Sequence, residues 1–111
     1  MAYDEELAAR IRGLVSDEPG LTDQRMFGGL AFLIHGNMAV AASSGGGLLL
    51  RIPPERTGEL ADKPHAERFA MRGREMDGWL RVAAGGMEAE ADLERWVSLG
   101  VGYARGLPPK R

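Results

Sequence analysis

The sequence predicts an α+β fold, a two-layer sandwich in which helices pack on one antiparallel sheet. Two amphipathic patterns stand near the two ends of the 111-residue chain, and five short apolar runs lie between them. The hairpin connections are too short for the crossovers that parallel strands need. The predicted order is helix, three strands, short helix, two strands and helix, in a single domain over residues 1–111.

The N-terminal segment has the periodicity of an amphipathic helix. Its apolar residues recur at three- and four-residue steps, at Tyr3, Leu7, Ile11, Leu14 and Val15. Pro19 lacks a backbone N–H and Gly20 tolerates positive φ, so neither continues a helix comfortably. We therefore expect the first helix to cover residues 3–15.

Short apolar runs punctuated by glycine follow in residues 25–42 and predict two strands. Gly36 and Asn37 suit the tight hairpin turn between them, because such turns need positive φ. Apolar residues occupy both odd and even positions from 30 to 34, so both faces of that strand are expected to be covered. It is predicted to be a central strand.

The next elements follow from the same signals. The loop at 43–47 contains three consecutive glycines and leads to a third strand at 48–52. Pro53, Pro54 and Glu55 suit the first turn of a short helix that ends near residue 61, since proline fits that turn and an early carboxylate favours the positive end of the helix dipole.

The C-terminal half predicts a second hairpin and a last helix. Strands are expected at 67–71 and 79–83 around a turn-rich segment at 72–78. The last helix begins near residue 88 and ends near residue 106, with acidic residues in its first turn. Residues 107–111 contain two prolines and are expected to form a frayed tail.

Composition narrows the classes of function. A formal charge of −2 and a pI near 5.7 disfavour attraction to nucleic-acid phosphates. The lack of cysteine excludes disulfides and thiolate chemistry and fits a reducing cytoplasm, where we expect the protein to be. No segment has the features of a signal peptide or the roughly 20 apolar residues of a membrane span.

The sequence contains no recognisable catalytic, metal-binding or cofactor-binding constellation, so we expect neither an enzyme nor a cofactor. His35 and His65 lack partners at metal-ligand spacing and are expected to be exposed turn residues. Ser43 and Ser44 have no assignable base. The glycines at 45–47 precede two leucines instead of the lysine and helix start of a phosphate-binding loop.

Four short motifs together resemble the N-terminal domain of the TfoX/Sxy family: residues 26–32 (MFGGLAF), 36–38 (GNM), 76–79 (MDGW) and 107–110 (LPPK). The resemblance extends over nearly the whole chain. It implies a fold similar to the secretion-chaperone-like α+β domains and a link to regulators of natural competence, without catalysis. Full-length family members carry a further helical C-terminal domain that has no counterpart in this sequence.

The leading hypothesis is therefore a non-catalytic regulatory domain that binds another protein, with a homodimer through the sheet or the last helix also expected. The candidate contact residues are Phe27, Gly28, Gly29, Trp79, Arg72 and Arg74. Gly28 and Gly29 would let a partner approach closely, but a bulge or a strand start that only glycine fits explains them better. Trp79 and Trp96 are predicted to lie in the core, while Trp79 also suits an interface.

Two alternatives stay open at the sequence level. A pocket near Phe27 and Trp79 would bind a small molecule or support catalysis, and it requires a concave apolar site with convergent polar groups. The local basic cluster of Arg68, Arg72, Arg74 and Arg81 would bind an anionic partner such as nucleic acid weakly.

Overall fold

The structure is a computed structural model that describes residues 3–26 and 28–109 of the chain. In chain order the elements are α1 (Glu5–Val15), β1 (Leu21–Met26), β2 (Gly29–Ile34), β3 (Asn37–Ala42), β4 (Leu48–Arg51), the 3-10 turn η1 (Pro54–Arg56), α2 (Thr57–Ala61), β5 (Ala66–Met71), β6 (Arg74–Val82), the 3-10 turn η2 (Ala84–Gly86) and α3 (Glu90–Arg105). The predicted α+β class with an antiparallel sheet is confirmed.

The sheet has six antiparallel strands in the order β1-β2-β3-β4-β6-β5. The structure adds β1 to the predicted elements. This strand is polar, with four exposed residues at its centre, and it lies at the edge of the sheet, so its sequence lacks the apolar alternation that marks a strand. β2 lies between two partners and all six of its residues are buried, as predicted for a covered strand.

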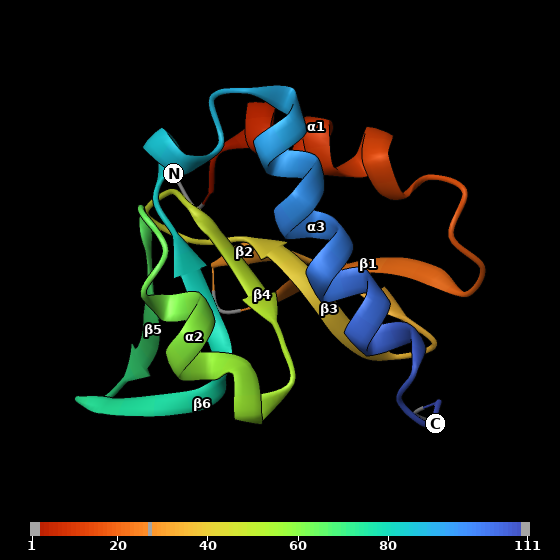
Figure 1. Ribbon diagram of the computed structural model, residues 1–111. Helices are drawn as coiled ribbons and strands as arrows, with labels where there is room; N and C mark the ends of the chain where they lie inside the picture. The colour runs from red at the N-terminus through yellow and green to blue at the C-terminus, as the bar shows by residue number, and fades with distance from the viewer. Residues whose placement is uncertain (1–2, 27, 110–111) are drawn as a thin grey trace.

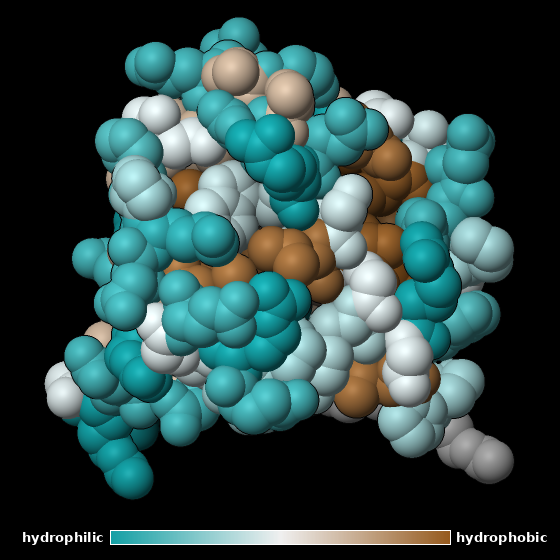
Figure 2. Space-filling model, viewed as in Figure 1, coloured by the Kyte–Doolittle hydropathy of each residue, from teal (hydrophilic) through white to brown (hydrophobic). Residues whose placement is uncertain are grey.

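The three helices pack on one face of the sheet (Figure 1). The core between these layers contains Ile11 of α1, Leu60 of α2 and Leu93 of α3, each at most 1% exposed. Figure 2 shows that hydrophilic side chains cover most of the outer surface on this side. The helices thus bury one face of the sheet. Among the described residues, no helix is long and apolar enough to cross a membrane.

α1 begins where the sequence provides a cap. Asp4 Oδ1 accepts a hydrogen bond from the backbone N–H of Leu7 at 3.1 Å, which satisfies one of the free donors of the first turn. Glu5 and Glu6 follow in that turn, where negative charge favours the helix dipole. The first helix is confirmed, with its start at residue 5.

α3 crosses the sheet over β3 and β4, and a bulge in β3 shapes the contact (Figure 1). The register between β2 and β3 shifts at Phe32 and Leu33, so one extra residue stands in β3. Gly100 of α3 faces this bulge, where a Cβ atom would lie 2.5 Å from the Ala39 carbonyl oxygen and 2.7 Å from a methyl carbon of Val40. Only glycine lets helix and strand approach so closely.

Both hairpin turns differ in detail from their predictions. The β2–β3 turn consists of His35 and Gly36, with φ of 51° and 86°, because Ile34 pairs with Asn37. The predicted turn at Gly36-Asn37 is therefore one residue too late. His35 is exposed in this turn as predicted, and His65, with φ of 69°, is exposed as well.

The β5–β6 turn is shorter than predicted. Arg72 and Gly73 alone form it, since Met71 pairs with Arg74. Residues 74–78 belong to β6, so the expectation of a turn over 72–78 is wrong for them. Residues 74–77 are exposed at the beginning of this long strand. Their mostly polar composition therefore resembles that of a loop.

The segment after α3 contacts the sheet. The side-chain amide of Asn37, which is 3% exposed, donates a hydrogen bond to the carbonyl oxygen of Pro108 at 2.8 Å. Leu107 N–H also bonds to the carbonyl of Ala104 at 3.1 Å. Of the predicted frayed tail, Lys110 and Arg111 lie outside the described residues, and Pro108 is held against the start of β3.

Candidate functional site

The second face of the sheet carries no helix of the described chain. Its centre is a small cluster of Ala31, Leu33 and Ala41, each at most 9% exposed. Met26, Met38 and Leu49 pack over this cluster from three strands and remain half-buried. A flexible apolar layer one side chain thick thus separates the centre of this face from solvent.

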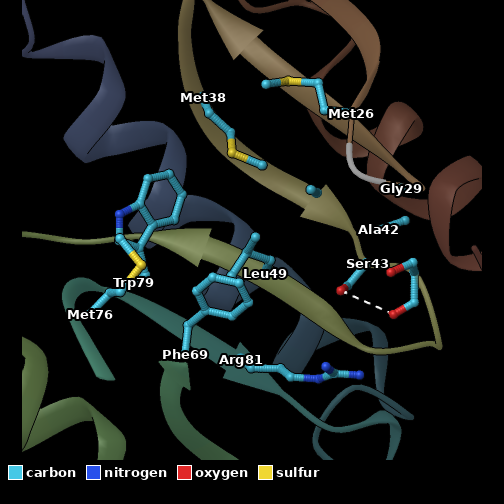
Figure 3. A pocket seen from close by; sticks show the side chains of 12 residues that line it. Met26, Gly29, Met38, Ala42, Ser43, Leu49, Phe69, Met76, Trp79 and Arg81 are labelled. Atoms are coloured by element: carbon cyan, nitrogen blue, oxygen red, sulfur yellow. Dashed lines mark hydrogen bonds between the residues drawn. The ribbon is translucent and has the colours of Figure 1, made fainter. Parts of the chain in front are cut away.

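This face holds a hollow of about 240 Å³. Its apolar wall consists mainly of Met26, Met38, Leu49, Phe69, Met76 and Trp79. Figure 3 shows Met26 and Met38 along one side and the rings of Phe69 and Trp79 on the other, with Leu49 between them. The wall includes side chains from both edge strands, β1 and β5, so the hollow crosses the whole sheet.

Trp79 closes one end of the hollow. It lies opposite Arg51 in the β4–β6 register, and the Arg51 guanidinium carbon lies 5.5 Å from the centre of its ring. The same guanidinium lies 5.8 Å from the centre of the Tyr103 ring of α3. Two cation–π contacts thus hold Arg51 and orient the indole. Trp79 is half-buried on the open face, so its prediction as a core residue is wrong, while Trp96 lies in the core as predicted.

The other end of the hollow is polar. Arg81 extends along it towards Ser43, away from Trp79 (Figure 3). Its Nη2 donates to the carbonyl oxygen of Gly46 at 2.8 Å. Ser43 Oγ donates to the carbonyl of Ser44 at 3.3 Å. The hollow is therefore amphipathic, with a cation and hydroxyl groups beyond a long apolar wall.

The hollow lacks the groups that acid–base or metal chemistry requires. Neither a carboxylate nor a histidine stands among its described lining residues. The part of the chain that the structure describes also contains no group of three metal-ligating side chains. A carboxyl with a shifted pKa is found elsewhere: the hydrogen bond and charge of Arg56 lower the pKa of Glu59, on the exposed surface of η1 and α2.

The predicted contact residues are only partly brought together. Gly29 and Trp79 line the hollow, and Gly28 lies beside it, with φ of 80° and its Cβ position 3.1 Å from Ser44 Cβ. Phe27 lies outside the described residues. Arg72 and Arg74 are exposed at the tip of the β5–β6 hairpin and do not line the hollow.

Gly29 has a structural reason to be glycine. A Cβ atom there would lie 2.5 Å from the Ala42 carbonyl oxygen, so β2 and β3 could not pair as they do. This agrees with the interpretation of the motif as a strand start that only glycine fits. Gly29 also lines the hollow.

The four arginines of the predicted basic cluster do not share a surface. Arg68 lies opposite Leu80, on the helix side of the sheet, and forms ion pairs with Asp77 and Glu75. Arg81 projects on the open face. Alternation along a strand sends neighbouring positions to opposite faces, which separates residues that are close in the sequence.

Sequence reasoning missed most of the apolar wall. Met26, Met38, Leu49, Phe69 and Met76 were not singled out, and their alignment depends on strand order. The sequence offered one signal, its six methionines. In the structure three of them line the hollow, and Met76 is 37% exposed. Exposed methionine is common on surfaces that bind varied apolar partners.

A second cleft lies between η2 and α3 and is larger, at about 470 Å³. Charged and polar groups line much of it, among them Lys63, His65 and Arg95. Arg95 is already paired with Asp92, three residues earlier on α3. Volume alone therefore does not identify the site, and the apolar hollow on the open face has the composition expected of a binding surface.

Comparison with known proteins identifies the family. The sequence profile described as the TfoX N-terminal domain matches residues 14–104, which include the whole sheet and nearly all of α3. No curated protein and no solved structure matches the chain. The matched range contains three of the four motifs, and the fourth, residues 107–110, lies just beyond it, where the Pro108 carbonyl accepts a hydrogen bond from Asn37. The chain belongs to the TfoX N-terminal domain family.

Proposed function

We propose that this chain is a non-catalytic, regulatory protein-binding domain of the cytoplasm, and that the open sheet face receives an apolar segment of a partner protein. The observation that carries the proposal is the hollow itself, an apolar wall of three methionines, Leu49, Phe69 and Trp79 that no helix of the described chain covers. Family membership supports a regulatory role of the kind associated with competence.

The volume of the hollow favours a side chain over a free ligand. Pockets for drug-sized molecules measure roughly 300–1,000 Å³ and bury most of the ligand. A closed cavity of about 150 Å³ holds one benzene molecule. The 240 Å³ hollow is therefore the size of one or two large apolar side chains, and the rest of their segment would lie along the sheet.

The shape of the hollow favours a different protein over a second copy. Two copies related by a two-fold axis through this face would place the same concave surface on both sides. Such surfaces leave a void between them, and voids forfeit packing energy. A convex apolar side chain fills the hollow, so the partner contributes a protruding anchor.

The small-molecule and nucleic-acid alternatives receive less support. The required concave apolar pocket is present at Trp79, but a single guanidinium with hydroxyl groups supplies no acid–base pair. Of the four arginines of the basic cluster, Arg68 is neutralised by Asp77 and Glu75, and Arg81 lies on the other face. A charge of −2 further weakens attraction to a phosphate backbone.

The test is a selection of random 12-residue peptides on the purified protein, followed by titration of synthetic peptides. We expect peptides with a large apolar anchor that bind in the micromolar range. Leu49→Asp places a charge in the wall and should weaken them at least tenfold, since burial of an unpaired charge is costly. Leu99→Asp makes the same change at a half-buried leucine of α3 and should leave binding unchanged.

The results of these experiments distinguish a partner protein from a second copy of this chain as the occupant of the hollow. Peptides that bind Leu49→Asp as tightly as the wild type would contradict the proposal, as would a selection that yields no specific binder. Sedimentation over micromolar concentrations tests the homodimer: self-association that Leu49→Asp abolishes and Leu99→Asp keeps would assign the face to a second copy.

A further inference from the structure

Arg81 is held in place by the glycine loop that connects β3 and β4. Gly45, Gly46 and Gly47 all have positive φ, at 80°, 94° and 85°. The loop is closed by backbone hydrogen bonds from Ser43 N–H to the Gly47 carbonyl and from Gly46 N–H to the Ser43 carbonyl, both 3.0 Å. The strand that bears Arg81 pairs with β4, so loop and guanidinium are fixed side by side.

The contact between this loop and Arg81 is close. The Gly46 carbonyl accepts from Nη2 at 2.8 Å, and the Cβ position of Gly47 lies 3.5 Å from Nε. A larger residue at 47 would also meet the carbonyl oxygen of Val82 at 3.0 Å. The loop therefore orients the guanidinium along the hollow and occupies one of its five N–H donors.

Arg81 has no carboxylate within 4.0 Å among the described residues. Glu67 is its register partner on β5, yet the two form no ion pair, because the guanidinium turns towards Gly46. Arg68, one position along β5, holds Asp77 and Glu75 on the other side of the sheet. Arg81 thus keeps free donors at the polar end of an apolar hollow.

We propose that the segment bound in the hollow carries an aspartate or glutamate next to its apolar anchor, and that Arg81 binds this carboxylate. This inference rests on the proposed function and specifies the chemistry of the partner. The apolar anchor lies against Leu49 and Trp79, and the carboxylate lies at the end formed by Arg81 and Ser43. A guanidinium presents two parallel donors that match the two oxygens of a carboxylate.

Because the chain has a net negative charge, we expect Arg81 to attract the carboxylate of the partner only at short range. At −2 the whole protein does not attract an acidic partner over long range, so the guanidinium acts within its own contact distance. Burial of the apolar anchor removes water around Arg81 and strengthens the pair. The apolar wall supplies affinity, and Arg81 determines which apolar segments are accepted.

The experiment repeats the peptide selection in parallel on the wild type and on Arg81→Gln. We expect wild-type peptides to carry Asp or Glu within two residues of the anchor more often than the input library does, and Arg81→Gln peptides to lose this enrichment. The titrations use a C-terminally amidated peptide that was selected on the wild-type protein. Replacement of its aspartate by asparagine, or of its glutamate by glutamine, should weaken binding about 3- to 10-fold. On Arg81→Gln the same replacement should have no effect.

Each result has a separate meaning. Peptides that depend on Leu49 but show no acidic enrichment, or whose acid-to-amide change leaves binding intact, overturn this inference and leave the proposed function standing. Peptides that do not depend on Leu49 overturn both. Arg81→Lys retains the charge without the paired donors and should restore part of the discrimination, while a loss of helix content in Arg81→Gln by circular dichroism would assign Arg81 a structural role instead.

Discussion

Asn37 and Pro108 join the start of β3 to the segment after α3 through one hydrogen bond of 2.8 Å, across 71 positions of sequence. The donor is a strand residue that is 3% exposed, so its amide has little access to water. The acceptor is a backbone carbonyl beyond the end of the last helix. The motifs at residues 36–38 and 107–110 thus contact each other and fix the C-terminal segment against the sheet.

Asn37→Ala should lower the free energy of unfolding by about 1 kcal/mol, because it removes a part-buried hydrogen bond, while the carbonyl of the exposed Pro108 can bind water instead. Urea denaturation followed by circular dichroism measures the change. Gln24→Ala alters an exposed amide of β1 and serves as the control, with an expected change within about 0.5 kcal/mol. Equal stability of Asn37→Ala and the control would show that the contact contributes nothing.

Gly100→Ala and Gly102→Ala should have opposite effects, although they are two residues apart on α3. A Cβ at 100 meets the Ala39 carbonyl oxygen at 2.5 Å, whereas nothing lies within 4 Å of a Cβ at 102. We expect Gly100→Ala to destabilise by about 1–3 kcal/mol through overpacking, and Gly102→Ala to stabilise by about 0.5–1 kcal/mol through helix propensity.

Thermal unfolding of the two variants provides the comparison. Stabilisation by both substitutions would mean that α3 does not approach the β3 bulge as closely as described. Destabilisation by both would mean that Gly102 has a contact of its own.

Thr57 connects α2 to β6 through its hydroxyl, which accepts from Gly78 N–H at 2.8 Å and donates to the Pro54 carbonyl at 2.7 Å. Thr57→Val keeps the shape of the side chain, which is 1% exposed, but removes the acceptor of the Gly78 N–H, while the Pro54 carbonyl keeps the backbone N–H of Thr57. We expect a loss of about 1–3 kcal/mol, the cost of a buried donor without a partner. Thr57→Ser retains the hydroxyl and should lose only about 1 kcal/mol for the buried methyl group.

Chemical denaturation of the threonine variants decides between packing and hydrogen bonding at this site. A smaller loss for Thr57→Val than for Thr57→Ser would indicate that the methyl group matters more than the hydroxyl.

The two tryptophans should differ in their access to solvent. Trp96 is 9% exposed in the core, while Trp79 is half-buried in the wall of the hollow. Acrylamide should therefore quench the fluorescence of Trp96→Phe, which retains Trp79, more strongly than that of Trp79→Phe. A bound apolar peptide should protect Trp79 from quenching and leave Trp96 unaffected. Equal quenching in the two variants would place Trp79 in the core after all.

The sequence by itself determined the class of fold and most of its elements. The amphipathic period of residues 5–15, the glycine-rich connections and the proline at the start of α2 act locally, so their effect is visible without the rest of the chain. The motifs likewise indicated the family, and three of the four lie within the range that the family model matches. The polar strand β1 was missed because an edge strand on the surface needs no apolar alternation.

Only the tertiary structure decided which face of the sheet stays open and which side chains meet there. In β2 both faces are apolar, so its sequence does not reveal on which side the helices pack. Met26, Leu49 and Trp79 come from three strands whose order depends on long-range pairing. The sequence predicts one cluster that includes Arg68 and Arg81, but the alternation of β5 and β6 sends them to opposite faces, and of these two only Arg81 lines the hollow.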